Sequence, residues 1–115
     1  MPKVDDLDAG DLVWVELDPV RGREQAGRRP AVVVTTSAYH KISQLALICP
    51  ITSNVRPWPF KVLLPDEGKI RGAVLVDQVR AIDRARRVYA RAGRVPDKTL
   101  DRIRSILAAM VRPNG

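Results

Sequence analysis

Histidine, cysteine and aromatic residues are scarce in this chain of 115 residues. Cys49 is the single cysteine, which excludes a disulfide within the chain and any metal site built from several thiolates. Because it lies in an apolar run, we expect a buried thiol with no part in the chemistry. His40 is the single histidine and follows Tyr39 in a polar turn, which indicates a surface position. Acid–base chemistry that uses a pair of histidines is therefore excluded.

Long apolar runs are also missing. No stretch approaches the roughly 20 consecutive apolar residues that a membrane span requires. Residues 1–6 are acidic and lack the apolar segment of a secretory signal, so we expect a protein that does not enter a membrane and works in the cytoplasm. The length suits a single domain over residues 1–115 with one core, too small for separate cofactor and substrate domains.

Positive charge is in excess and unevenly distributed. The chain carries 20 lysines and arginines against 13 acidic residues, and 15 of those 20 are arginine. Residues 1–18 hold one lysine against six acids, whereas residues 19–64 hold seven basic residues against Glu24 alone. The planar arginine fork suits phosphate and carboxylate groups. We therefore expect an anionic partner, either a nucleic acid or an acidic protein segment.

Five or six short strands are predicted from runs of β-branched and aromatic residues bounded by turn residues. The runs cover residues 11–17, 31–36, 44–49, 59–64, 72–76 and 78–82. So many short strands in one small domain predict a closed or half-closed barrel.

The spacing of apolar residues changes near the C-terminus. Asp97, after Pro96, is predicted to cap a helix that ends before Pro113. Its apolar face consists of Leu100, Ile103, Leu107, Met110 and Val111. The predicted fold class is therefore mainly β with a C-terminal packing helix.

A long, charged loop over residues 18–30 connects the first two predicted strands. It contains Arg21, Arg23, Arg28 and Arg29. These arginines can converge on phosphate, while Glu24 and Gln25 offer a carboxylate and an amide to a base edge or a sugar hydroxyl. The alternative is a solvated surface connection without a ligand.

This loop and its flanking strands resemble the signature region of the MazF/PemK toxins. Residues 10–33 keep the family pattern G-D-x-x-W-x-x-x-x-P-x-x-G-x-E-Q-x-G-x-R-P-x-x-V. Residues 50–53, Pro-Ile-Thr-Ser, resemble the second family motif, and residues 73–82 resemble the third. The resemblance covers nearly the whole chain, with the motifs in the right order and spacing.

The resemblance implies an SH3-like barrel with a C-terminal helix that works as a homodimer. It implies the toxin of a type II toxin–antitoxin system, an mRNA interferase that cuts single-stranded RNA at short motifs. The cut needs no metal or other cofactor and leaves a 2′,3′-cyclic phosphate and a 5′-hydroxyl. The implied partners are a MazE-like antitoxin with an acidic, disordered segment and, only as a complex with that antitoxin, operator DNA.

The same resemblance assigns a catalytic pair. Arg29 matches the arginine before proline in the first motif, and Thr52 matches the threonine of the second. Arg29 can stabilise the charge on a phosphorane because a guanidinium binds two phosphate oxygens at once. Thr52 either orients a phosphate oxygen or is a strand-end hydroxyl bonded to backbone. Glu24 joins the catalytic set, either as the proton acceptor or as a group that contacts a nucleobase or positions the 2′-hydroxyl.

Eight further residues are predicted to bind RNA. They are Arg23, Gln25, Arg28, Ser53, Arg56, Trp58, Gln78 and Arg80. Trp58 either stacks on an unpaired base or packs at the edge of the core. The family commonly has a small residue at the position of Arg23, so the cleavage motif of relatives is not carried over.

Roles in packing or in binding the antitoxin are predicted for several residues outside the catalytic and RNA-binding sets. Trp14 alternates with apolar residues and is expected in the core. Asp77 is a candidate brace for an arginine. Five arginines form either a solvated basic face or part of the antitoxin surface: Arg84, Arg86, Arg87, Arg91 and Arg94.

Three other functions agree less well with the sequence. No cluster of carboxylates or histidines has metal-ligand spacing, so a two-metal nuclease is not supported. Non-enzymatic gyrase poisons of the same barrel end in Trp-Gly-Ile, whereas this chain ends in Arg-Pro-Asn-Gly. A peptide-binding SH3-like module needs an aromatic groove, and the five aromatic residues are spread over the chain.

Overall fold

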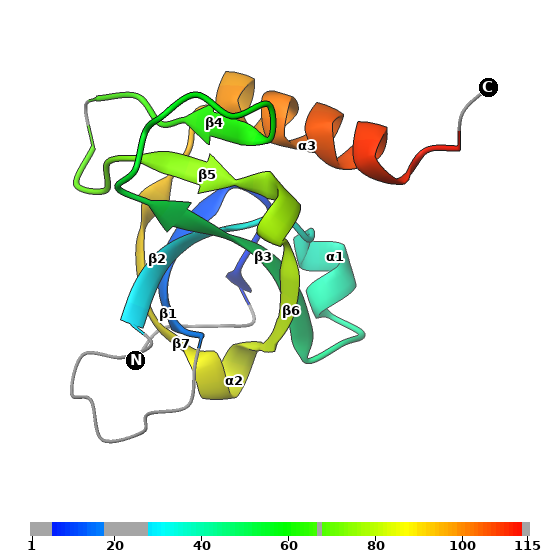
Figure 1. The fold of residues 1–115 in the computed structure, drawn as a ribbon. Coiled ribbons are helices and arrows are strands. Elements are labelled where there is room, and N and C mark those ends of the chain that lie inside the picture. The colour runs from blue at the N-terminus through cyan, green and yellow to red at the C-terminus, as the bar shows by residue number, and fades with distance from the viewer. Residues whose placement is uncertain (1–5, 18–27, 67, 114–115) are drawn as a thin grey trace.

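The computed structural model describes residues 6–17, 28–66 and 68–113 as a curved sheet with a long helix across one side (Figure 1). The strands are β1 (Asp11–Glu16), β2 (Arg28–Val33), β3 (Leu45–Thr52), β4 (Lys61–Leu63), β5 (Ala73–Leu75), β6 (Arg80–Asp83) and β7 (Val88–Arg94). The helices are α1 (Ser37–His40), α2 (Arg84–Arg87) and α3 (Asp97–Val111), and a 3-10 turn, η2, covers Val76–Gln78.

The strands form one antiparallel sheet in the order β4-β5-β3-β2-β1-β7, with β6 beside β3. Among the described strands no ladder joins β7 to β4 or β6, so hydrogen bonding leaves the sheet open and the closed barrel is not formed. The predicted class, mainly β with a C-terminal helix, is confirmed. In the part of the chain that the structure describes, no helix is long and apolar enough to cross a membrane.

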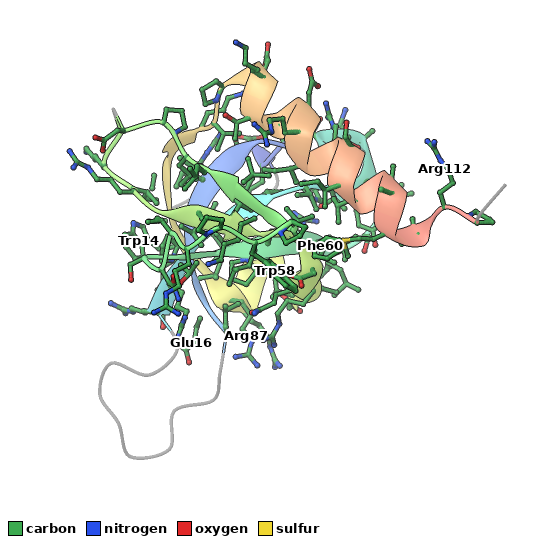
Figure 2. All side chains as sticks on the ribbon, turned by 45° about the horizontal axis from the view of Figure 1, so that its top comes forward. Trp14, Glu16, Trp58, Phe60, Arg87 and Arg112 are labelled. Carbon is green, nitrogen blue, oxygen red and sulfur yellow. The ribbon has the colours of Figure 1, made fainter. Side chains whose placement is uncertain are left out.

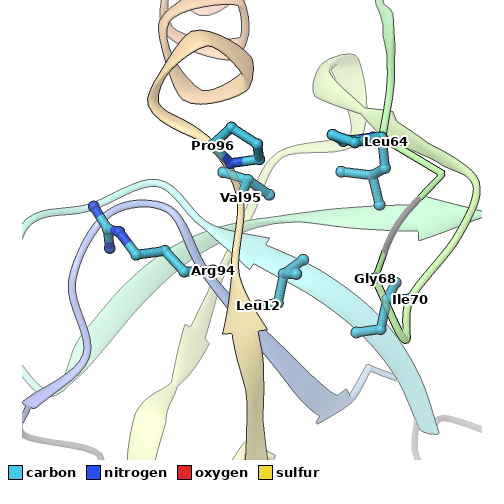
Figure 3. Close-up of a pocket in the computed structure, with 8 residues that line it drawn as sticks. Leu12, Leu64, Gly68, Ile70, Arg94, Val95 and Pro96 are labelled. Carbon is cyan, nitrogen blue, oxygen red and sulfur yellow. The ribbon is translucent and has the colours of Figure 1, made fainter.

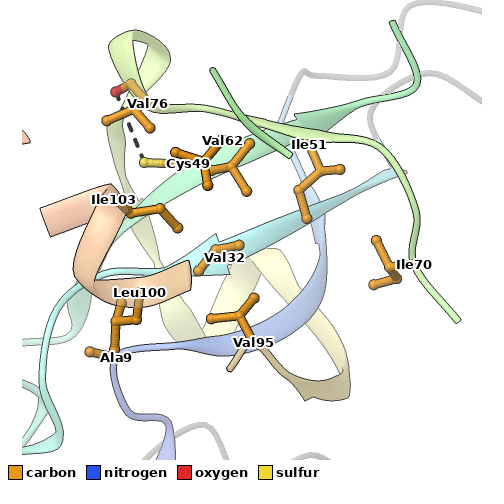
Figure 4. Close-up of a cluster of buried hydrophobic side chains, with 11 residues drawn as sticks. Ala9, Val32, Cys49, Ile51, Val62, Ile70, Val76, Val95, Leu100 and Ile103 are labelled. Atoms are coloured by element: carbon orange, nitrogen blue, oxygen red, sulfur yellow. Dashed lines mark hydrogen bonds between the residues drawn. The ribbon is translucent and has the colours of Figure 1, made fainter. Parts of the chain in front are cut away.

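Two apolar clusters cover the two faces of the central strands, which explains why residues 31–33 of β2 and most of β3 are continuously apolar. The inner cluster, inside the curve of the sheet, contains Leu7, Val13, Val15, Leu17, Ala31, Val33, Ile48, Ile82 and Val88. The outer cluster fills the space beneath α3 and includes Val32, Cys49, Ile51, Val62, Leu100 and Ile103 (Figure 4). Successive side chains of a strand point to opposite faces, so neighbours such as Ala31 and Val32 belong to different clusters.

The six predicted strands are present, with different ends. β2 begins at Arg28 rather than at residue 31, and β3 continues to Thr52. The helix α3 also begins differently, because Pro96 is its N-cap and Asp97 makes no side-chain capping hydrogen bond. The prediction of Asp97 as the cap is therefore wrong. Its carboxylate lies in the first helical turn, where negative charge favours the helix dipole.

Trp14 is not a core residue, and that prediction is wrong. Its neighbours Val13 and Val15 point into the inner cluster, so the alternation of β1 turns Trp14 to the other face, where its side chain is 40% exposed.

His40 is buried rather than on the surface, which corrects a second prediction. The Leu7 carbonyl oxygen can only accept, so the His40 Nδ1 donates to it at 2.8 Å. The other ring nitrogen, Nε2, then accepts from the Thr35 hydroxyl at 2.7 Å. The imidazole thus joins α1 to the segment before β1.

The arginines of residues 84–94 have several environments rather than one shared surface. Arg84 is buried, and its guanidinium donates to the carbonyl oxygens of Ser43 and, at 2.7 Å, His40. Arg91 and Arg94 pair with the buried carboxylate of Asp11 at 3.1 and 3.2 Å. These three arginines therefore have structural contacts, and the strand β7 that carries two of them was not predicted.

Candidate active site

A pocket of about 220 Å³ opens at one end of the inner apolar cluster. It is lined by Leu17, Arg29, Pro50, Gln78 and Arg80. Three of these side chains, those of Arg29, Gln78 and Arg80, were predicted to bind RNA or to act on it. They come from β2 and from the continuous stretch of η2 and β6, so strand pairing around β3 brings together two segments that are far apart in the sequence.

Strand register explains why both arginines face this pocket. Arg29 pairs with the buried Val15 of β1 and lies two residues before Ala31 of the inner cluster. Arg80 pairs with Ile48 of β3 and lies two residues before Ile82, and both apolar residues belong to that cluster. Because side chains alternate along a strand, each arginine continues an inward-facing row at the point where the row reaches solvent.

The pocket is suited to an anion. Both arginine side chains are exposed, and neither has an ion pair or a hydrogen bond with any residue in the described ranges. Two like charges at one pocket repel each other, and a phosphate between them removes that repulsion while accepting hydrogen bonds from both. Two exposed guanidinium groups at one pocket are therefore suited to an anion such as a phosphate.

Thr52 lies at the end of β3, beyond the lining of this pocket. The β2–β3 pairing ends at Ala31 and Pro50, so Arg29 and Thr52 each lie two residues beyond the last pair on their own strands. The Thr52 Oγ1 accepts a hydrogen bond from the backbone amide of Asn54 at 3.1 Å. The alternative predicted from the sequence, a strand-end hydroxyl bonded to backbone, is therefore present. That contact uses an oxygen lone pair and leaves the hydroxyl proton available to a phosphate oxygen.

Gly72 fixes the backbone at Thr52. Its φ is +125°, and a Cβ atom at this position would lie 2.1 Å from the Thr52 carbonyl oxygen. A glycine is therefore required here, and the close approach holds the end of β3 against β5.

A second hollow, of about 250 Å³, contains other predicted RNA-binding residues. It is lined by Val55, Arg56, Pro57, Trp58, Lys61, Leu63 and Arg102. The Trp58 ring is 50% exposed and lies edge-on to Phe60 (Figure 2). Its Nε1 donates to the Asp77 carboxylate at 3.2 Å, so Asp77 braces a tryptophan and not an arginine. Ser53 is exposed but lines neither hollow.

A third hollow, of about 190 Å³, lies beside the end of β7 (Figure 3). Its lining is mostly apolar and contains none of the predicted site residues. Arg94 at its edge already pairs with Asp11.

Comparison with known proteins decides the family. Residues 8–111 match the family model described as "PemK-like, MazF-like toxin of type II toxin-antitoxin system". The chain belongs to this MazF/PemK family. Similar curated proteins include the endoribonuclease toxin MazF of Escherichia coli K12, which is 36% identical over 104 residues, or 90% of this chain and 93% of the relative. The endoribonuclease toxin ChpB of the same strain is 36% identical over 116 residues, or 96% and 99% of the two chains.

Solved structures of the MazF/PemK family have the same fold. A MazE–MazF structure from Deinococcus radiodurans matches with a TM-score of 0.83 and 37% identity, covering 95% of this chain and 98% of the other. A structure of MazF from the same organism matches with a TM-score of 0.79 and 39% identity, covering 91% and 96%.

Arg28, at a variable position within the first motif region, lies away from the pocket. Arg28 precedes Arg29 on β2 and points to the opposite face, where its guanidinium carbon lies 4.0 Å from the centre of the Tyr89 ring. The Tyr89 hydroxyl donates to Glu16, which pairs with Arg28 across the two strands. Arg28 therefore stacks on an aromatic ring on the outer face of the sheet.

Three predicted residues of the family motif, Arg23, Glu24 and Gln25, lie outside the described residues, so their roles stay predictions. Within the described ranges no group of three or more histidine, cysteine or acidic residues is placed to hold a metal ion.

Cys49 is the buried thiol that the sequence predicted. Burial, followed by the charge of Asp77, raises the pKa of Cys49 to about 12. The thiol therefore stays protonated and unreactive at neutral pH.

Residues missed by the sequence analysis complete the second hollow. The Lys61 ammonium donates to the carbonyl oxygens of Asn54 and Arg56 at 2.8 and 3.0 Å, which holds the loop after β3. Arg102 reaches the same hollow from α3. Arg102 is not among the residues of the predicted apolar face of this helix, and nothing in the sequence placed it at the same hollow as Trp58.

Proposed function

We propose that this endoribonuclease toxin cuts single-stranded RNA at the pocket of Arg29, Gln78 and Arg80, with the ribose 2′-hydroxyl as the nucleophile. The observation that carries the proposal is the pair of exposed guanidinium groups, without partners among the described residues, at one pocket beside the second family motif. The family's curated relatives named endoribonucleases support RNA as the substrate.

The chemistry proceeds by transfer within the RNA. The 2′-oxygen loses its proton and bonds to the adjacent phosphorus, and the bond from phosphorus to the 5′-oxygen breaks. The departing 5′-oxygen takes up a proton, so the products are a 2′,3′-cyclic phosphate and a 5′-hydroxyl. Negative charge accumulates on the non-bridging oxygens, where Arg29 and Arg80 supply fixed positive charge and hydrogen bonds.

The proton transfers involve other groups. A guanidinium donates hydrogen bonds and has no free lone pair to accept a proton, so Arg29 acts through its charge and its N–H groups. Thr52 offers its hydroxyl proton to a phosphate oxygen. Glu24 belongs to the site either as the acceptor of the 2′-hydroxyl proton or as a group that positions this hydroxyl.

Other polar residues bind the strand around the cut. Gln78 can pair with a base edge through its amide, since an amide donates and accepts at once. Arg23, Gln25, Arg28, Ser53 and Arg56 are proposed to contact flanking phosphates or bases. Among these, Arg28 is directed to the outer face of the sheet, so its contact is with RNA beyond the pocket.

We propose that the open, curved sheet is the half-closed form of an SH3-like barrel, and that the chain assembles as a homodimer in the cytoplasm with a MazE-like antitoxin as its partner. The MazE–MazF structures to which this chain is similar support the antitoxin. The net charge of +7 favours an acidic segment that competes with RNA for the arginines. Operator DNA is bound only as a complex with the antitoxin.

The test incubates the protein with one long unstructured RNA in EDTA and maps the 5′ ends of the fragments. We expect cuts at one recurring short motif, fragments with 5′-hydroxyl ends, and the same rate with or without EDTA, because the nucleophile and the positive charge come from RNA and protein. A DNA strand of the same sequence is the control and stays intact. Loss of cleavage in EDTA, or cleavage of the DNA, contradicts the proposal.

A further inference from the structure

The Trp58 ring is exposed and yet held in a fixed orientation. Half of its surface is open to solvent, while its Nε1 donates to Asp77 at 3.2 Å. Phe60 meets it edge-on, with ring centroids 5.6 Å apart. An aromatic ring that is already oriented loses little conformational freedom when a base stacks on it. The free face of Trp58 is thus suited to a planar ligand.

The loop beside Trp58 is fixed by a chain of hydrogen bonds that begins at Thr52. The Thr52 Oγ1 accepts from the Asn54 amide at 3.1 Å, and the Asn54 Oδ1 accepts from the Arg56 amide at 3.0 Å. Lys61 binds the carbonyl oxygens of Asn54 and Arg56 from the other side. The hollow is therefore connected to the end of β3, where the proposed cleavage chemistry takes place.

The turn η2 connects the two hollows directly. Asp77 orients Trp58 in one, and the next residue, Gln78, lines the other with Arg29 and Arg80. Consecutive Cα atoms lie about 3.8 Å apart. The two hollows therefore meet at this turn, and a nucleic-acid strand bound at one can continue toward the other.

The edge of the Trp58 hollow is basic. Arg56 and Arg102 both line it, are exposed, and form no ion pair with any residue that the structure describes. The carboxylate of Asp77 already accepts a hydrogen bond from Trp58. A flat aromatic face beside two arginines matches a nucleobase joined to its phosphate better than it matches an acidic peptide, which has charge but no planar ring.

We propose that the Trp58 hollow is a nucleotide subsite of this toxin: an unpaired base next to the cut stacks on Trp58, and its phosphate lies against Arg56 and Arg102. The inference rests on the proposed function and adds a position to it. Because every base has a π face, this subsite contributes affinity for the strand without selecting the base.

The first experiment reports on Trp58 alone. Trp14 and Trp58 are the two tryptophans of the chain, so Trp14→Phe leaves Trp58 as the single indole. This variant is titrated with an RNA that spans the mapped cut and carries a 2′-deoxy nucleotide there. We expect saturable quenching of Trp58 emission. Unchanged emission at saturating RNA overturns the inference. A peptide of alternating glutamate and leucine is the comparison ligand, and quenching by this peptide without quenching by RNA assigns the hollow to an acidic peptide instead.

The second experiment locates the stacked base. We expect Trp58→Ala to weaken binding of the same RNA by about 5- to 150-fold, the equivalent of one stacked base. Trp58→Phe, which keeps an aromatic face, should recover most of that affinity. Removing the base at one flanking nucleotide should weaken wild-type binding by the same factor and cause no further loss in Trp58→Ala. Trp14→Ala, at an exposed tryptophan on the outer face of β1, is the matched control and should bind as the wild type does.

The outcomes separate the two proposals. A wild type that cuts RNA while Trp58→Ala binds it equally well removes the subsite and leaves the proposed function. If the losses of RNA affinity caused by Trp58→Ala and by base removal multiply at every flanking nucleotide, no one base depends on Trp58 and the subsite is also ruled out. A folded wild type that neither binds nor cuts RNA overturns the proposed function and this inference with it.

Discussion

At the scale of residues, the alternation of strand β2 decides which arginine can act on a phosphate. Arg28 and Arg29 are neighbours with the same charge, but one stacks on Tyr89 outside the sheet and the other lines the pocket. Arg80 reaches the same pocket from β6 because it pairs with Ile48. The positive charge at the proposed site therefore depends on strand register as much as on composition.

This alternation gives a matched pair of variants. Arg29→Ala should lower kcat/KM for RNA cleavage by about 10²- to 10³-fold, the usual effect of removing one donor that stabilises a transition state. We expect Thr52→Ala to lose comparable activity. Both proteins should keep their fold, because Arg29 is exposed and the Thr52 hydroxyl bonds only one loop amide.

The control is Arg28→Ala, which removes the same charge from the opposite face of β2 and should cost less than about tenfold, as expected of a flanking phosphate contact. The measurement is cleavage of a fluorogenic RNA, with circular dichroism to verify folding. A folded Arg29→Ala protein that cuts at the wild-type rate removes Arg29 from the site.

The sequence predicted the environment of Cys49 correctly and those of His40 and Trp14 wrongly, and the reasons are physical. Cys49 lies in an apolar run, and its burial follows from that local pattern. The environment of His40 depends on Leu7 and Thr35, and the Leu7 contact spans 33 residues, so no local pattern reveals it. Trp14 was placed in the core by its size and apolar neighbours, although the two-residue period of β1 assigns it to the face opposite Val13 and Val15.

At the scale of elements, β7 shows how a distant residue determines a strand. Its sequence, Val-Tyr-Ala-Arg-Ala-Gly-Arg, is rich in alanine, glycine and arginine, which gives little β propensity. The strand pairs with β1, where the buried Asp11 carboxylate binds Arg91 and Arg94. The sequence of β7 therefore suggested only a basic surface, because Asp11, whose carboxylate binds the arginines of this strand, lies about 80 residues earlier in the chain.

Asp11 gives a stability test for this arrangement. Asp11→Ala removes the acceptor for both arginines and for the Asp8 amide, which donates to it at 2.8 Å. We expect the free energy of unfolding in urea to fall by about 1 to 3 kcal/mol, the range for lost hydrogen bonds to a charged group. The exposed half of each arginine stays solvated, which limits the loss.

The control for Asp11 is Asp101→Ala on α3, whose carboxylate lies 3.8 Å from Arg104 with both side chains exposed. It should change stability by less than about 1 kcal/mol, as surface ion pairs do. Equal losses of unfolding free energy in the two variants would show that the burial of Asp11 does not stabilise the pairing of β1 with β7.

At the scale of the whole molecule, a long motif predicted more than composition did. Net charge allowed either a nucleic acid or an acidic protein as the partner, whereas the pattern over residues 10–33 and its two later motifs indicated the family directly. The family match over residues 8–111 confirms it. The motif also assigned Arg29, and side-chain chemistry added Gln78 and Arg80 as candidates. Their meeting in one pocket requires β2 and β6 to flank β3, which no local pattern contains.

The account as a whole depends on the nucleophile, and one substitution tests it most directly. An RNA spanning the mapped cut is compared with the same RNA carrying a single 2′-deoxy nucleotide on the 5′ side of the cut bond, both in EDTA. We predict that the all-ribose strand gives a 2′,3′-cyclic phosphate and a 5′-hydroxyl, and that the 2′-deoxy strand binds but is not cut at that bond. Cleavage of the 2′-deoxy strand at an unchanged rate would require a different nucleophile and would contradict the account.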